Sequence, residues 1–162
     1  MRRSFLMLEA MLAAAIVAIA AAAAAIPFAA GLNAVTDAHR IEKAVLLAEA
    51  MLAEIRARPF EDPNTPTDHT LGPDAGESTR TAYDNVDDFH GLSESAGAMK
   101  SMAGTTISDS DLASFYRTVS VQYVTMPGQL AWDSYAFALV TVTVNDNRGP
   151  VVTVKRLLAR EY

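Results

Sequence analysis

The sequence predicts an α+β fold, in which one long N-terminal helical region is followed by a small antiparallel sheet. Three observations carry this prediction. The chain from Ala10 to Leu32 is apolar and carries no charge. Apolar residues then recur every three or four positions from Ile41 to Ile55, as on one face of a helix. After residue 115 the apolar residues alternate with polar ones, which is typical of half-buried strands.

Residues 5–32 form the first predicted element, a membrane-spanning helix. A helix rises about 1.5 Å per residue, so this stretch is long enough to cross the ~30 Å apolar layer of a bilayer. Residues 1–4 are a short basic leader with Arg2 and Arg3, and the next charge after the apolar stretch is Asp37. The positive-inside rule therefore places the N-terminus in the cytoplasm and the remainder outside. We expect Pro27 to kink or weaken this helix, because proline removes a backbone donor.

Residues 33–58 form a second, amphipathic helical stretch, which is either separate or continuous with the first as one kinked rod. Thr36 or Asp37 can cap its start, and it should end near Arg58 because the residue before Pro59 avoids helical geometry. The predicted core face consists of Ile41, Val45, Ala48, Leu52 and Ile55, widened by Leu47 and Met51.

Residues 59–114 form an irregular connecting region, and residues 115–162 form the sheet. The connecting region is rich in proline and glycine; Tyr83, Val86, Phe89 and Leu92 can anchor it as a strap across the sheet, while 96–106 is the stretch most typical of disorder. Strands are predicted at 115–125, 135–144 and 151–158, with a turn at 145–149. We interpret residues 33–162 as one exported domain.

Composition excludes several classes of function. Beyond residue 32 the chain holds 11 Lys+Arg and 18 Asp+Glu, because two of the 13 basic and one of the 19 acidic residues come earlier; the net charge there is −7. Such acidity argues against nucleic-acid binding. The chain has no cysteine, which excludes thiol catalysis and cysteine zinc sites. No Walker loop, Gly-x-Ser-x-Gly or His-Glu-x-x-His motif is present, so we do not expect an enzyme.

A cluster of carboxylates is the candidate metal site. Asp84, Asp87 and Asp88 lie close together in the sequence, with His90 beside them. Carboxylate oxygens suit a hard cation such as calcium, although the spacing is not that of an EF-hand. The alternative is a solvated acidic loop in which these residues cap turns.

Glu9 is the residue of the apolar region that most needs a functional explanation. A carboxylate costs about 2.5–3.5 kcal/mol at the centre of a bilayer. The stretch from Met1 to Glu9 resembles the N-terminus of type IV prepilins and type II secretion pseudopilins, in which a basic leader precedes a phenylalanine and a glutamate follows four residues later. Phe5 and Glu9 occupy those two positions. The alternative is a glutamate that reaches the membrane interface and has no further role.

The resemblance implies a pilin-like fold and a structural role as a minor pilin, similar to those of the MSHA type, or as a pseudopilin. It implies cleavage between Ser4 and Phe5 by a prepilin peptidase, methylation of Phe5, and pairing of Glu9 with the amino group of a neighbouring subunit. The family usually has glycine where this chain has Ser4, so cleavage and retention of the whole chain both stay open. The implied partners are other pilins in the inner membrane. A secreted or membrane-anchored periplasmic binding module without a filament is the alternative.

Overall fold

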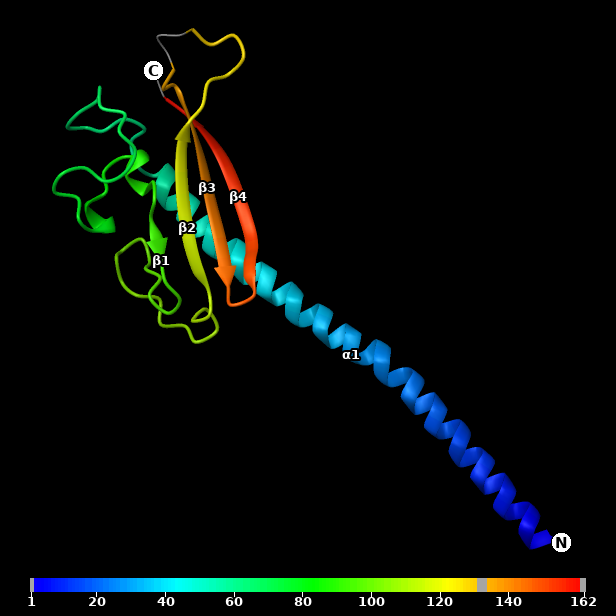
Figure 1. Cartoon of the computed structure of the whole chain (residues 1–162). Helices are drawn as coiled ribbons and strands as arrows, with labels where there is room; N and C mark the ends of the chain where they lie inside the picture. The colour runs from blue at the N-terminus through cyan, green and yellow to red at the C-terminus, as the bar shows by residue number, and fades with distance from the viewer. Residues whose placement is uncertain (1, 131–133, 161–162) are drawn as a thin grey trace. The chain divides into compact units, whose positions relative to one another are not determined.

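The fold is α+β, as predicted: one long helix precedes a four-stranded antiparallel sheet (Figure 1). The computed structural model describes residues 2–130 and 134–160, with side chains from Met7 onward. Contacts divide the chain into two compact units, Met1–Arg40 and Ile41–Tyr162. The elements are α1 (Arg2–Arg56), the short 3₁₀ helices η1 (Arg80–Ala82) and η2 (Asp87–Phe89), and the strands β1 (Ser93–Glu94), β2 (Tyr116–Tyr123), β3 (Phe137–Asp146) and β4 (Gly149–Ala159).

Helix α1 joins the two predicted helical stretches into one element of 55 residues. It continues through Pro27, where an interruption was one expectation. Pro27 lies close to a run of alanines, and these residues are the best helix formers, so they support helical geometry despite the missing donor. The helix ends at Arg56, shortly before Pro59, because the residue that precedes a proline avoids helical geometry. Its N-terminal part is long and apolar enough to cross a membrane.

The sheet has the strand order β1-β2-β3-β4, and every neighbouring pair is antiparallel. Strands β3 and β4 are joined by a two-residue turn at Asn147 and Arg148, inside the predicted turn. The three long strands match the predicted ones within a few residues. Strand β1, a two-residue strand inside the connecting region that pairs with β2, was not predicted.

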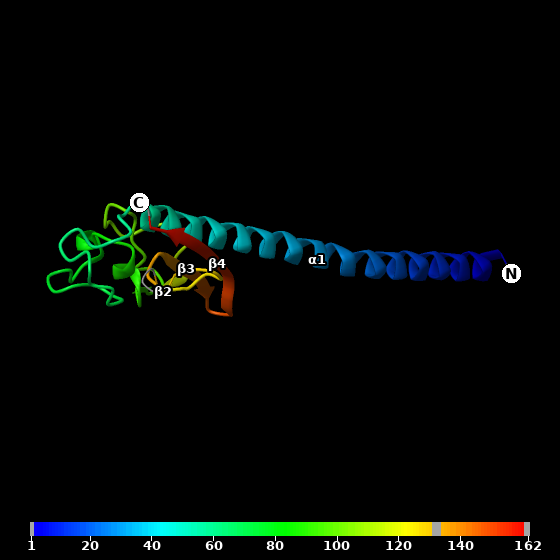
Figure 2. The same ribbon diagram turned by 90° about the horizontal axis from the view of Figure 1, so that it is seen from above.

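The core of the second unit lies between the last turns of α1 and one face of the sheet, which lie side by side in Figure 2. The buried apolar residues of α1 are Ala44, Leu47, Ala48, Met51, Leu52 and Ile55. The prediction was wrong for Ile41, which is 48% exposed, while Val45 is half-buried. At 100° per residue Val45 falls at the margin of the buried stripe, whereas Ile41 lies within its arc but one turn before Ala44, the first buried residue of the helix.

The connecting region packs as a strap, because Tyr83, Val86 and Phe89 are buried in the same core and Leu92 packs against it. The prediction of disorder at 96–106 was wrong. Met99 is only 2% exposed in this segment, and Lys100 forms an isolated bridge with Thr106. The side chain of Met99 packs in the core, and the backbone of Lys100 bonds to Glu94, Arg80 and Arg117, so these distant contacts hold the segment in place.

Candidate functional site

The N-terminal part of α1 presents an unbroken apolar surface around Glu9. Every described side chain from Met7 to Leu32 is exposed, including Ile26 at 76% and Phe28 at 71%. Glu9 lies on this surface without a hydrogen bond or ion pair to any described residue, and Leu12 and Ala13 are its neighbours one turn later. The side chains of Ser4 and Phe5 lie outside the described residues, so cleavage and methylation stay predictions.

The acidic cluster that forms differs from the predicted one by one member. Glu77, Asp84 and Asp88 each place a carboxylate oxygen within 4.8 Å of the others. Oδ2 of Asp88 accepts hydrogen bonds from the backbone N–H groups of Asp84, at 2.9 Å, and Asn85, at 3.0 Å. Asp84 accepts from the side-chain amide of Asn64, at 2.9 Å. The loop therefore holds these three carboxylates close together despite their charge.

Asp87 does not belong to this cluster, which corrects the predicted set. Consecutive residues of the 3₁₀ helix η2 point about 120° apart, so Asp87 and Asp88 face different surroundings. Asp87 accepts a hydrogen bond from the Tyr123 hydroxyl at 2.5 Å, and burial raises the pKa of both groups. His90 binds the backbone of Val121 through Nδ1, at 2.8 Å from its oxygen. Asp87 and His90 thus attach η2 to β2.

Glu77 is the unusual member of the acidic cluster. Loss of hydration and the nearby Asp88 and Asp84 carboxylates raise the pKa of Glu77 from 4.5 to about 7, against a lowering by the N–H of Asp74. A site of three carboxylates with only oxygen ligands fits calcium in its chemistry. At neutral pH the cluster therefore has two ways to relieve its repulsion: Glu77 keeps a proton, or a cation binds.

A buried network of charges links four elements and was not predicted from the sequence. Glu54 of α1, Arg80 of η1, Glu94 of β1 and Arg117 of β2 are each under 10% exposed and form alternating ion pairs. The backbone oxygen of Lys100 accepts from both arginines, at 3.0 and 2.8 Å, and that of Leu47 accepts from Arg117 at 3.0 Å. Arg117 shares the inward face of β2 with Val119 and Val121. A charge at an inward strand position was the available clue.

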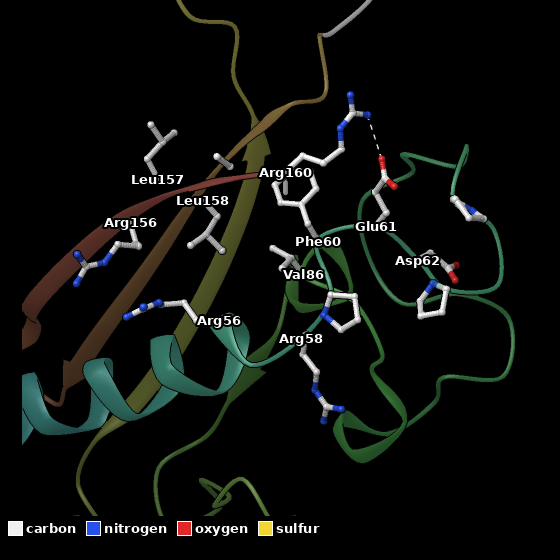
Figure 3. A pocket seen from close by; sticks show the side chains of 14 residues that line it. Arg56, Arg58, Phe60, Glu61, Asp62, Val86, Arg156, Leu157, Leu158 and Arg160 are labelled. Carbon is white, nitrogen blue, oxygen red and sulfur yellow. Dashed lines mark hydrogen bonds and ion pairs between the residues drawn. The ribbon is translucent and has the colours of Figure 1, made fainter. Parts of the chain in front are cut away.

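A cavity of about 840 Å³ lies beside the end of α1 (Figure 3). It is bounded by the end of the helix, the proline-rich loop that follows it and the last residues of β4. At one end Arg160 donates to Glu61 at 3.0 Å. Four of the lining residues are arginines: Arg56, Arg58, Arg156 and Arg160. The cavity therefore gathers positive charge in a domain whose net charge is negative.

Comparison with protein-family models, with curated proteins and with solved structures finds no match to this chain. The geometry of the chain itself is therefore the basis for assigning a function.

Proposed function

We propose that this protein is a structural subunit of a filament, a minor pilin or pseudopilin of a type IV pilus or type II secretion system, and has no enzymatic role. The observation that carries the proposal is the exposed apolar surface of α1 from Met7 to Leu32, with Glu9 alone in it. The remaining support is the resemblance of residues 1–9 to prepilins and the packing of the last turns of α1 on an antiparallel sheet.

The apolar surface explains how one helix serves both a membrane and a filament. Each Å² of apolar surface removed from water contributes about 25 cal/mol, whether lipid or another helix covers it. The alanine-rich composition favours the second cover, because small side chains let helices approach closely in an apolar environment. The subunit is held in the inner membrane first and then transferred into a bundle of equivalent helices.

Glu9 supplies the selective interaction in this mechanism. A carboxylate in an apolar environment is costly unless it is paired, so a neighbouring amino group is strongly favoured there. After cleavage by a prepilin peptidase the amino group of Phe5 would be that partner. In an uncut chain Arg2 or Arg3 would provide the positive charge.

The proposed location follows from the distribution of charge. Arg2 and Arg3 precede the apolar stretch, and the acidic region begins beyond it at Asp37. We infer a single-pass inner-membrane protein with a cytoplasmic N-terminus and a periplasmic C-terminal domain. The intact mass of the mature protein tests this against the alternative of a secreted or simply anchored binding module. A start at Phe5 supports the pilin, a start near Ile26 supports the secreted module, and Met1 fits an anchor or an uncut pseudopilin.

The decisive experiment replaces Glu9 with leucine. Glu9→Leu removes a charge from the apolar surface, so the variant should stay in the membrane at normal levels. Crosslinking to sibling pilins in the same membranes should fall sharply, because the interhelix charge pair is lost. Membrane fractionation and crosslinking are measured on the same samples.

Glu49→Gln is the matched control. Glu49 is an exposed glutamate of the same helix, beyond the apolar stretch, so its replacement should leave both membrane levels and crosslinking unchanged. Wild-type crosslinking by Glu9→Leu would refute the assembly role. Loss of Glu9→Leu from the membrane would instead refute the argument from insertion.

A further inference from the structure

Strand β4 is a free edge of the sheet. It ends the strand order β1-β2-β3-β4 and is 11 residues long, and no described residue pairs with its other side. Long unpaired edges are templates for adding another strand, so proteins usually shorten or block them. This edge is accessible, because Lys155, Leu157 and Ala159 are exposed.

The register fixes which backbone groups face outward. The N–H of Arg160 donates to the oxygen of Ala136 at 2.8 Å, so Ala136 and Arg160 are a hydrogen-bonded pair. In an antiparallel ladder such pairs alternate, and Leu158 opposite Ala138 and Arg156 opposite Val140 therefore also bond to β3. The N–H and C=O groups of the intervening Lys155, Leu157 and Ala159 consequently point away from β3, toward the free edge.

Basic side chains outnumber acidic ones near this edge, because four arginines line the cavity against Glu61 and Asp62. Arg156 of β4 and Arg56 at the end of α1 are both exposed and line the same cavity, and Figure 3 shows both extending beside the helix end. Neither has a hydrogen bond or ion pair to a described residue. Of the other two arginines, Arg160 pairs with Glu61. The charge of Arg58 acts to lower the pKa of Asp84, while its buried Nε has no hydrogen-bond partner among the described residues.

Apolar side chains adjoin these two arginines. Phe60 and Leu158 are partly buried, and Val86 is buried; all three line the cavity. The face of an added strand that looks toward α1 would therefore meet apolar contacts and two free positive charges. In a domain with net charge −7, these two arginines would attract an acidic partner locally rather than repel it.

We infer that β4 and the adjoining cavity bind an extended acidic segment of a partner protein, which adds to the sheet as a fifth strand. Its backbone pairs with Lys155, Leu157 and Ala159, and one of its carboxylates reaches Arg56 and Arg156. This is strand addition, with main-chain hydrogen bonds for affinity and alternate side chains for specificity. The inference does not depend on the filament role of α1.

The basic side chains near β4 have an alternative explanation, which predicts that no strand is added. Charged side chains on an edge strand can serve only to prevent pairing with other chains. In that case neither acidic nor basic peptides would pair with β4. The experiment therefore compares peptides of opposite charge on the same edge.

The test uses the full chain in neutral detergent micelles and a nine-residue peptide of alternating glutamate and valine. We expect saturating peptide to slow amide hydrogen exchange of Leu157 and Ala159 at least tenfold and to leave η1 unaffected. The matching peptide of lysine and valine should give no protection. Equal protection by both peptides, or none by the acidic one, would overturn the inference.

Two sets of variants locate the contact. Arg56→Gln and Arg156→Gln should each weaken the acidic peptide about tenfold or more, because a charge-assisted hydrogen bond is lost. Lys100→Gln, at an exposed site beyond β1, is the matched control and should bind as the wild type does. Unchanged affinity in both arginine variants would refute the carboxylate contact.

Leu157→Pro removes one outward N–H while sparing the ladder with β3, so it should reduce protection by the peptide at an unchanged unfolding midpoint. Full protection in that variant would refute strand addition. Citrate is the last probe: if citrate alone binds to Arg56 and Arg156 while the peptide fails to protect β4, the cavity is a small-anion site and the inference fails.

Discussion

The buried charges show how single residues tie together parts of the chain that are far apart in sequence. Glu94 accepts from Arg80 at 2.5 Å and also pairs with Arg117, while Arg80 also pairs with Glu54. Isolated charges would be very costly at such sites, but each member here has a partner of opposite sign. The network joins α1 and the connecting region to β1 and β2, where packing alone gives little directional restraint.

Removing one residue of this buried network should therefore lower the free energy of unfolding strongly. Arg117→Met deletes the donors to Leu47 and Lys100 and one of the two cations of Glu94, so we expect a loss of about 3–5 kcal/mol of unfolding free energy. Chemical denaturation measures it. Lys100→Gln removes an exposed charge nearby, and its midpoint should stay within experimental error. Equal midpoints for Arg117→Met and wild type would show that the network is not needed for stability.

Glu77 leads to a prediction of how stability depends on pH. Its pKa is about 7 in the folded chain against an ordinary 4.5, so between these values the folded chain holds a proton that the unfolded chain has released. Stability from this group is therefore greatest below pH 4.5 and falls as the pH rises toward 7. With a chelator present, Glu77→Gln should show a smaller decline in unfolding midpoint from pH 5 to pH 8 than wild type. Parallel declines would contradict the assignment.

Adding calcium tests whether the same cluster binds a cation. If Glu77, Asp84 and Asp88 hold calcium, adding it at pH 8 should raise the unfolding midpoint of the wild type, because a ligand that binds only the folded state stabilises it. Glu77→Gln should lose this rise, while Asp87→Asn should keep it, because Asp87 faces Tyr123. No rise in the wild type would leave the cluster as a solvated acidic loop with a shared proton.

At the scale of elements, the position of the buried stripe on α1 can be tested by two identical substitutions. Leu52→Asp places a charge at a site that is 1% exposed and should cost several kcal/mol. Ile41→Asp is made on the same helix at a site that is 48% exposed, and its effect should be much smaller. Denaturation midpoints measure both. Similar losses for the two would mean that the stripe predicted from sequence, with Ile41 on it, was right.

The elements with a clear period could be predicted from the sequence, and those held by distant contacts could not. The helix and the three long strands follow from spacings of three to four and of two, which are local properties. Strand β1 depends on pairing with β2, and the segment around Met99 depends on a core that other elements build. Asp84 and Asp88 lie together as their closeness in the sequence indicates, whereas Glu77 reaches them only through the fold of the loop.

At the scale of the whole molecule, the two units have different chemistry. The unit Met1–Arg40 exposes its apolar side chains along Met7–Leu32, whereas the unit Ile41–Tyr162 encloses a core and carries most of the acidic residues. The first needs lipid or other helices around it, because so large an apolar surface is unfavourable in water. The second has a core of its own.

Truncation at two points tests this division. Deleting residues 1–32 removes the exposed apolar stretch and leaves every buried residue of α1, so the product should be soluble and should unfold cooperatively. Deleting residues 1–58 also removes the helical side of the core, together with Glu54 and the Leu47 carbonyl that accepts from Arg117. That shorter product should lack a cooperative transition, since one sheet face and two buried arginines lose their cover. Circular dichroism during thermal or urea unfolding distinguishes the two outcomes. Cooperative unfolding of the shorter product would show that the sheet and its strap fold without α1. Failure of the longer one would show that the core depends on residues 1–32.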